Sequence, residues 1–130
     1  MAPASPPPLA LLVDDDPGVL AFLGEVLDAA GWQHTAVSRG DAVVELCREL
    51  QPELVLMDVL MPGSDGFTVL SHIRSDRDLD DVRVVLVSGG PSEVHGEIAR
   101  RLGAEDFLEK PPSLSALERV LRVSRAGASR

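Results

Sequence analysis

The stretch LVLMDVLMPGSDG, residues 54–66, indicates the fold of this chain most directly. Residues 54–57 are a short, continuous apolar run, which is typical of a strand buried on both faces of a parallel sheet. The run ends at a single aspartate, Asp58, and residues 61–66 then supply one proline and two glycines, which predict a loop. This stretch therefore predicts a buried strand that ends in a carboxylate.

The same succession of a short apolar run and a longer helical pattern occurs five times along the chain. The expected strands are 9–13, 32–37, 54–57, 82–87 and 106–109, and the expected helices are 17–30, 38–50, 67–75, 92–102 and 113–123. We expect three N-caps and two glycine stops, which are Asp16, Ser38, Ser113, Gly31 and Gly103. Five such units predict an α/β fold with a doubly wound, five-stranded parallel sheet and helices on both faces.

The composition limits the classes of partner. The 130 residues suit one domain, and 12 basic against 21 acidic residues give a net charge of −9. This charge repels nucleic acid and anionic lipid, so we expect no direct binding to nucleic acid or membrane. The single cysteine, Cys47, excludes an intrachain disulfide and is expected to be a buried core thiol. No apolar run approaches the roughly 20 residues of a membrane span, and the sequence predicts a cytoplasmic protein.

The ends of the chain differ in composition from its centre. Residues 1–8 are rich in proline and small residues and are expected to form a flexible lead-in. Residues 9–124 hold all five units and are expected to be the folded domain. Residues 125–130 are expected to be a loose tail or the start of a linker to a further domain.

Reactive side chains stand at the carboxyl ends of four expected strands. Asp14 and Asp15 follow the first strand, Asp58 the third, Ser88 the fourth and Lys110 the fifth. In doubly wound sheets, ligands bind at this edge, where the strand order reverses. We therefore expect these five side chains to form one site.

The residue types in this group favour phosphoryl chemistry. Converging carboxylates repel one another unless a cation offsets their charge, and hard oxygen ligands favour Mg²⁺. Lys110 adds a fixed positive charge and Ser88 a hydroxyl donor, so the group could neutralise and bind a phosphoryl group. A carboxylate can itself be the nucleophile, giving an acyl phosphate, and Asp58 is the candidate because it stands alone at its strand end.

Other polar and aromatic residues have simpler structural interpretations. Asp16 is expected only to cap a helix. His34, His72 and His95 are expected to have surface or structural roles away from the site. Trp32 is expected to cover the sheet edge rather than to bind a ligand.

Four motifs, spread over roughly residues 9–123, resemble the receiver domains of two-component response regulators. They are LLVDDDP at 11–17, LVLMDVLMPGSDG at 54–66, VLVSG at 85–89 and DFLEKP at 106–111. The resemblance implies a CheY-like, flavodoxin-like (βα)5 fold with strand order 2-1-3-4-5. It also implies phosphorylation of Asp58 by a histidine kinase or a histidine phosphotransfer protein, within a phosphorelay.

The resemblance further implies a role for each site residue. Mg²⁺ would be bound by Asp15, Asp58 and the backbone carbonyl of Leu60, with Asp14 acting mainly through water. Ser88 and Lys110 would contact the phosphoryl group.

In this family, two of the matched positions also carry the switch. The resemblance implies that Ser88 turns toward the phosphate and that Phe107 turns inward behind it, although an aromatic on a short strand is often ordinary core. The motion would change the face built by the fourth helix, the fifth strand and the fifth helix, which would bind a downstream target or output domain. The Lys110–Pro111 bond is implied to be cis.

Two positions beside the site lack the polar side chains that would orient a hydrolytic water. These are Leu60, two residues after Asp58, and Gly90, two residues after Ser88. We expect slow self-dephosphorylation, with an acyl phosphate that lasts many minutes or longer.

Several alternatives stay open at this point. The chain could be a fragment of a longer regulator or of a hybrid histidine kinase, and it could be a monomer or a phosphorylation-dependent dimer. A Mg²⁺-dependent phosphohydrolase with an aspartyl nucleophile is a second class, but Val59 and Leu60 replace its usual second aspartate and no cap domain fits. A third alternative is a degenerate receiver that serves only as a docking surface. We expect a phosphoacceptor and not an enzyme.

Overall fold

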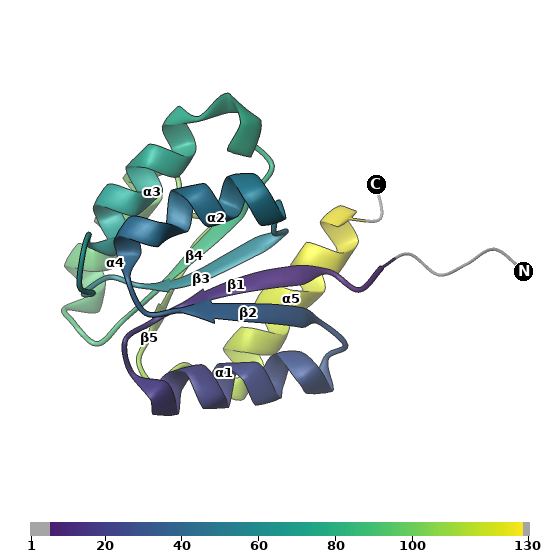
Figure 1. Cartoon of the computed structure of the whole chain (residues 1–130). Coiled ribbons are helices and arrows are strands. Elements are labelled where there is room, and N and C mark those ends of the chain that lie inside the picture. The colour runs from purple at the N-terminus through teal and green to yellow at the C-terminus, as the bar shows by residue number, and fades with distance from the viewer. Residues whose placement is uncertain (1–5, 129–130) are drawn as a thin grey trace, which may run out of the picture.

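The computed structural model describes residues 6–128, with side chains as far as Arg122, and in this part of the chain strands and helices alternate (Figure 1). The strands are β1 (Leu9–Val13), β2 (Gln33–Val37), β3 (Leu54–Asp58), β4 (Arg83–Ser88) and β5 (Asp106–Glu109). The α-helices are α1 (Pro17–Ala29), α2 (Val43–Leu50), α3 (Gly66–Ser75), α4 (Ser92–Leu102) and α5 (Leu114–Ala128). Two 3-10 turns, Gly40–Ala42 and Arg77–Leu79, precede α2 and follow α3.

The five strands form one parallel sheet in the order β2-β1-β3-β4-β5. β1 pairs with β2 on one side and with β3 on the other, so the chain winds outward in both directions from β1. This arrangement confirms the doubly wound fold and the predicted strand order. The carboxyl ends of β1 and β3 lie next to each other at the point where the order reverses.

Helices cover both faces of the sheet and create two cores (Figure 1). On one face, α2, α3 and α4 pack on a cluster that includes Leu11, Val55, Met57 and Leu86. Cys47 is buried there, and burial raises the pKa of its thiol to about 11, which confirms the expected core thiol.

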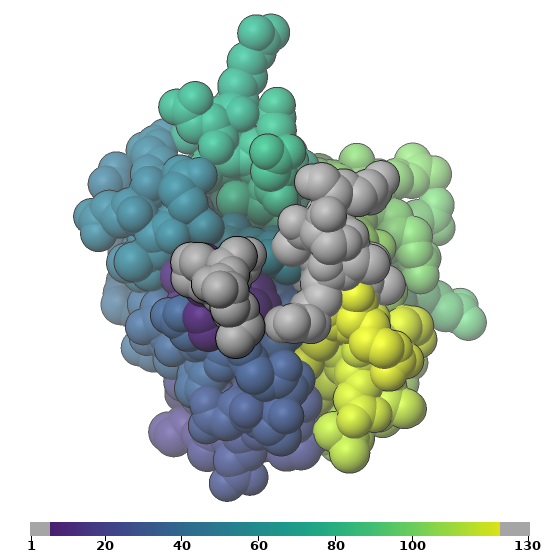
Figure 2. Space-filling view, turned by 90° about the vertical axis from the view of Figure 1, so that its right-hand side faces the viewer, coloured from purple at the N-terminus to yellow at the C-terminus, as the bar shows by residue number. Residues whose placement is uncertain are grey.

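On the other face, α1 and α5 pack on the second cluster, which includes Leu12, Leu27, Leu56 and Leu117. Trp32 is buried in this cluster, at the turn between α1 and β2. Figure 2 shows the end of α1 and the following turn beside α5. Trp32 and Leu121 are among the residues that line a small surface hollow between these elements. Trp32 therefore closes the core at this end of the molecule.

Helix ends follow the expected residues at most positions. The Asp16 carboxylate accepts a hydrogen bond from the Gly18 N–H at 2.8 Å, and the Ser113 hydroxyl accepts one from the Ala116 N–H at 3.1 Å. Gly103 ends α4 with a φ of 101°, a conformation that favours glycine. These caps confirm the predicted limits of α1, α4 and the start of α5.

Two predicted helix limits are wrong. Ser38 does not cap α2, because the Gly40 N–H donates to the Pro62 carbonyl at 3.0 Å and the chain makes a 3-10 turn before α2 begins. The predicted tail at 125–130 is helical as far as Ala128, since residues 124–128 contain no proline and include strong helix formers. Residues 129 and 130 lie outside the described part.

The start of the domain is tied to the sheet edge. The Gln33 N–H donates to the carbonyl of Pro8 at 2.8 Å, so the last residue of the predicted lead-in continues the line of β1 beside β2. Residues 1–5 of the lead-in lie outside the described residues. Within the described residues, no helix is both long and apolar enough to cross a membrane.

Candidate functional site

Asp58 lies at the carboxyl end of β3, in the middle of the sheet edge where the order reverses. Its residue is only 7% exposed, and Gly66 at the start of α3 packs directly behind it. A Cβ atom at Gly66 would lie 2.6 Å from the Asp58 carbonyl oxygen, and the Gly66 N–H donates to the Val59 carbonyl at 2.7 Å. Because Gly66 has no side chain, α3 can begin directly against the end of β3. The hydrogen bond from Gly66 to Val59 then holds the backbone next to Asp58.

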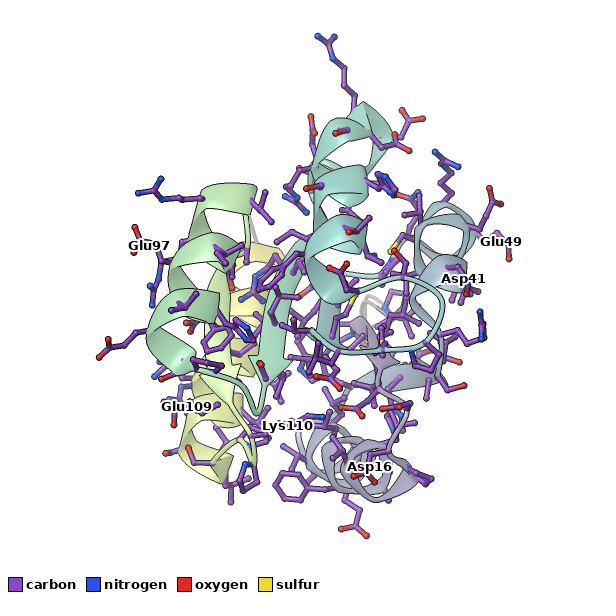
Figure 3. The ribbon with its side chains drawn as sticks, turned by 90° about the vertical axis from the view of Figure 1, so that its left-hand side faces the viewer. Asp16, Asp41, Glu49, Glu97, Glu109 and Lys110 are labelled. Carbon is purple, nitrogen blue, oxygen red and sulfur yellow. The ribbon has the colours of Figure 1, made fainter. Side chains whose placement is uncertain are left out.

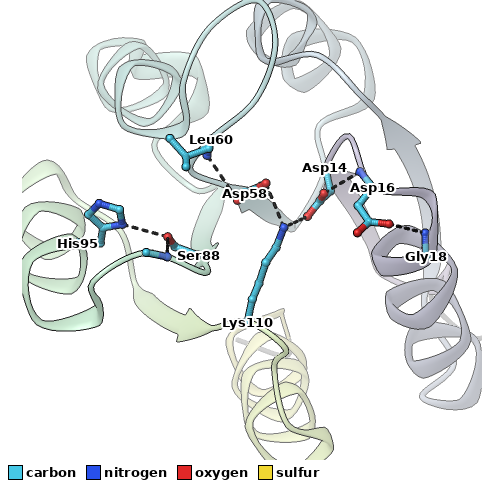
Figure 4. A network of polar contacts seen from close by, with 9 residues as sticks. Asp14, Asp16, Gly18, Asp58, Leu60, Ser88, His95 and Lys110 are labelled. Atoms are coloured by element: carbon cyan, nitrogen blue, oxygen red, sulfur yellow. Dashed lines mark hydrogen bonds and ion pairs between the residues drawn. The ribbon is translucent and has the colours of Figure 1, made fainter.

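Lys110 bridges the two buried carboxylates of the edge (Figure 4). Its Nζ lies 2.8 Å from Oδ2 of Asp14 and 3.0 Å from Oδ2 of Asp58. The Lys110 backbone N–H donates to the carbonyl of Ser88 at 2.9 Å, and the Lys110–Pro111 peptide bond is cis, as the resemblance implied. The ammonium group is thus held between the ends of β1 and β3.

The pKa values of this trio respond to burial and to mutual contact. Burial, together with the nearby charge of Asp14, raises the pKa of Asp58 above its ordinary value, although the hydrogen bond from Lys110 opposes this. Burial lowers the pKa of Lys110, but its hydrogen bonds to Asp14 and Asp58 outweigh burial and leave this pKa raised. The Lys110 ammonium group is therefore favoured beside the two carboxylates, whereas burial disfavours the charged form of Asp58.

A third carboxylate joins the pair from the exposed side. Asp14, Asp15 and Asp58 each place one carboxylate oxygen within 4.8 Å of the others. Asp14 and Asp58 are buried and Asp15 is exposed, so a cation bound there would be partly open to water. Three hard oxygen donors at a hydrated edge fit Mg²⁺.

Neighbouring backbone groups hold these carboxylates in place. The Asp16 N–H donates to Oδ1 of Asp14 at 2.9 Å, and the Leu60 N–H lies 3.4 Å from Oδ1 of Asp58. Asp16 itself caps α1 and lies below and to the right of Lys110 in Figure 3. The structure thus separates Asp16, a helix cap, from the three carboxylates that face one another.

Ser88 lies at the end of β4 and is 1% exposed. Its hydroxyl oxygen lies 2.9 Å from Nδ1 of His95, and it accepts a hydrogen bond from the Gly90 N–H at 3.0 Å (Figure 4). The expectation that His95 lies away from the site is therefore wrong. The helix α4 begins close enough to the end of β4 for its first turn to contact Ser88.

The other singled-out residues occupy different surroundings. Phe107 is half-buried on β5 and packs against the core under α4. Leu60 is 68% exposed in the loop after β3. His34 binds Asp28 at 2.8 Å and His72 lies on the exposed side of α3, so these two histidines lie outside the site, as expected.

His95 is the residue near the site that reasoning from the sequence missed. Its signal was weak, because it lies seven positions after Ser88 in the sequence, beyond a loop. The pair Gly89–Gly90 offered a clue, since a glycine next to a strand end can mark a place where another side chain approaches closely. A Cβ atom at Gly90 would lie 2.4 Å from Cε1 of His95.

The sheet order and helix arrangement define a CheY-like α/β protein. The family model of the response regulator receiver domain matches residues 10–122. This chain belongs to that family.

Relatives and solved structures agree with this assignment. The chain is 32% identical to the protein PilH of Pseudomonas aeruginosa over 90% of its own length and 97% of that protein. It is 34% identical to the transcriptional regulatory protein BaeR of Escherichia coli O6:H1 over 82% of its own length, but it spans only 43% of BaeR. A crystal structure of a putative response regulator from Chloroflexus aurantiacus J-10-fl superposes with a TM-score of 0.86, at 26% identity, over 92% of this chain and 98% of that one.

Proposed function

We propose that this receiver domain accepts a phosphoryl group on Asp58 from a histidine kinase or a histidine phosphotransfer protein. The observation that supports this most is the convergence of Asp14, Asp15 and Asp58 with Lys110 at one strand-end edge. A buried carboxylate between a fixed ammonium group and a place for a divalent cation is suited to attack phosphorus.

The proposed reaction needs only Asp58 and a phosphohistidine as reactants. One oxygen of Asp58 attacks the phosphorus of a phosphohistidine, the bond between phosphorus and the imidazole nitrogen breaks, and the imidazole leaves with the electron pair. The product is an acyl phosphate on Asp58. Bound Mg²⁺ would neutralise charge on the phosphoryl oxygens.

Each neighbouring residue has a proposed part in this reaction. Asp15, Asp58 and the backbone carbonyl of Leu60 would hold Mg²⁺ directly, and Asp14 would act mainly through water. Lys110 would exchange its contact with the Asp58 carboxylate for one with a phosphoryl oxygen, while keeping its contact with Asp14.

Ser88 would donate its hydroxyl hydrogen to another phosphoryl oxygen. The change at Ser88 and at Phe107 would then alter the face built by α4, β5 and α5. We propose that this face binds a downstream target or output domain. The protein would be either a monomer or a phosphorylation-dependent dimer.

The domain limits also belong to this proposal. Residues 9–124 would be the receiver and residues beyond 124 the start of a linker or tail, with the final helix continuing to Ala128. The chain spans about half the length or less of regulators such as BaeR but nearly all of PilH. The proposal for this chain therefore covers the receiver domain. An output domain, or a place in a longer regulator or hybrid kinase, would be a property of the whole protein.

Labelling with acetyl phosphate and Mg²⁺ tests the central claim. We expect intact-protein mass spectrometry to show one added phosphoryl group, and Asp58→Asn to abolish it. Asp65→Asn is the matched control, because Asp65 follows the same strand but caps α3, and asparagine caps helices equally well. Absence of labelling in the wild-type protein, or labelling that survives Asp58→Asn, would contradict the proposal and favour a docking role.

A second measurement separates the signalling module from an enzyme. We expect no turnover of small phosphate esters such as p-nitrophenyl phosphate. We also expect the acyl phosphate to last many minutes, since the aliphatic Leu60 side chain cannot orient a water. A lifetime of seconds in the purified, Mg²⁺-loaded protein would contradict this expectation.

A further inference from the structure

The end of β4 and the first turn of α4 share a polar contact that the proposed phosphoryl chemistry does not use. Ser88 Oγ and His95 Nδ1 lie 2.9 Å apart. The Ser88 hydroxyl oxygen also accepts the Gly90 N–H at 3.0 Å, so its own hydrogen is available to Nδ1. Among the described residues, the hydrogen bonds of the Ser88 side chain go to Gly90 and His95 and not to Asp58.

We propose that His95 is a positioning residue that holds the Ser88 hydroxyl away from Asp58 until a phosphoryl group is bound. This inference rests on the proposed function, in which Ser88 donates to a phosphoryl oxygen. A serine hydroxyl has one hydrogen, so it cannot be donated to Nδ1 and to a phosphoryl oxygen at once. The contact with His95 therefore opposes phosphoryl binding by the free energy of one hydrogen bond.

The surroundings of His95 place its ring for this role. Gly90 leaves room for the imidazole, because a Cβ atom at residue 90 would lie 2.4 Å from Cε1 and 2.8 Å from Nδ1 of His95. The other side of the imidazole meets the Phe67 ring of α3 edge to face, with centroids 5.4 Å apart at 83°. The ring is therefore held between the loop after β4 and α3, with Nδ1 directed at Ser88.

The same turn of α4 also contacts the predicted aromatic switch. Gly96, the residue after His95, lies over Phe107, since a Cβ atom at Gly96 would be 3.5 Å from Cδ2 of Phe107. Releasing Ser88 from His95 would free a segment of α4 that touches Phe107. In this way the contact between Ser88 and His95 links the phosphoryl site to the face built by α4, β5 and α5.

The test measures beryllofluoride binding with Mg²⁺ by calorimetry at about pH 8, where an ordinary imidazole is neutral. Beryllofluoride mimics a bound phosphoryl group and needs no transfer step. We expect His95→Phe, which keeps the aromatic contact but cannot accept a hydrogen bond, to tighten binding by about 2- to 10-fold. His95→Asn should restore the wild-type affinity, because its Oδ1 lies where Nδ1 lies in histidine.

Two further variants separate this role from a merely structural one. Gly90→Ala should tighten binding similarly while residue 95 stays histidine, because its methyl group, which would lie 2.4 Å from Cε1 of His95 and 3.3 Å from Oγ of Ser88, would displace the imidazole from Ser88. In a Ser88→Ala background, which itself weakens binding, His95→Phe should have no further effect. The inference would be overturned if both His95→Phe and Gly90→Ala bound beryllofluoride as tightly as the wild-type protein or more weakly. It would also be overturned if His95→Phe tightened binding equally in the Ser88→Ala background.

Nitrogen NMR of the imidazole gives a readout that does not depend on binding strength. We expect neutral His95 to carry its hydrogen on Nε2. When beryllofluoride binds, Nδ1 should lose the nitrogen chemical shift that is typical of a hydrogen-bond acceptor. A hydrogen on Nδ1 in the free protein would overturn the inference while leaving the proposed function intact. Failure of the wild-type protein to bind beryllofluoride and to be labelled at Asp58 would overturn both.

Discussion

At the amino end of the sheet, Arg83 meets Glu105 with two guanidinium nitrogens, whereas at the carboxyl end Lys110 is shared between Asp14 and Asp58. Arg83 also donates to the carbonyl of Val120 at 3.3 Å, which ties β4 to α5. The first arrangement fits a planar guanidinium to a planar carboxylate, and the second shares one ammonium group between two buried carboxylates. The same sheet thus uses charge for stability at its amino end and leaves charge unbalanced, with three carboxylates to one lysine, at the end where a ligand can bind.

The largest expected effect tests the unbalanced end. Lys110→Met should lower the free energy of unfolding by about 2–3 kcal/mol at neutral pH without Mg²⁺, because it leaves two buried carboxylates facing each other. Urea denaturation measures this loss, and Lys110→Arg, which retains the charge, should lose less. A loss of the same size under acidic conditions, where Asp58 is protonated, would show that packing and not charge is responsible.

At the amino end, Arg83→Met should lower the free energy of unfolding by about 1–2 kcal/mol, since it removes hydrogen bonds to the partly exposed carboxylate of Glu105 and to the Val120 carbonyl. The same urea measurement applies. Added Mg²⁺ should stabilise this variant and the wild-type protein equally, so the difference between them should remain, because Arg83 lies at the opposite end of the strands from the acidic site. A smaller difference in the presence of Mg²⁺ would contradict the separation between the two ends.

Removing the buried charge of Asp58 should have the opposite sign. Asp58→Asn should stabilise the Mg²⁺-free protein at neutral pH by about 1 kcal/mol, because burial and the nearby charge of Asp14 disfavour the charged carboxylate more than the contact with Lys110 favours it. Because folding raises the pKa of Asp58, this carboxyl lowers stability as pH rises from the ordinary value of 3.8 through the raised folded value. The gain in the variant should therefore vanish below that ordinary value, as thermal melts across pH would report. A gain that persists there would mean that charge is not its cause.

The smallest expected effect comes from the cation itself. Mg²⁺ at three times its Kd should stabilise the wild-type protein by about 0.8 kcal/mol. Asp15→Asn should reduce this response, whereas Arg83→Met should retain it in full. If Mg²⁺ stabilised the wild-type protein, Asp15→Asn and Arg83→Met equally, the cation would bind at a place other than the three aspartates.

Most of the fold was predictable from the sequence because local signals and tertiary packing agree. The strands β1, β3 and β4 are buried on both faces and appear in the sequence as continuous apolar runs. The end of each run then brings Asp14, Asp58 and Ser88 to one edge. The boundaries failed where a distant contact decides the local structure, as at Ser38, where the Pro62 carbonyl binds the following turn.

The site itself was only partly predictable. Residues at strand ends could be placed together because parallel strands end at a common edge. His95 could not, because its approach to Ser88 depends on how α4 packs after the glycine pair, which a linear pattern does not specify.

Gly66 gives the site a constraint on its evolution. This position has no reactive group, yet any side chain there would press on the Asp58 carbonyl and on Cα of Val59. In a saturation mutagenesis library selected for signalling, residue 66 should tolerate as few replacements as Asp58 does. A lineage could therefore exchange the side chain of the exposed Leu60 without disturbing the backbone of Asp58, but it could not alter Gly66 without also moving the nucleophile.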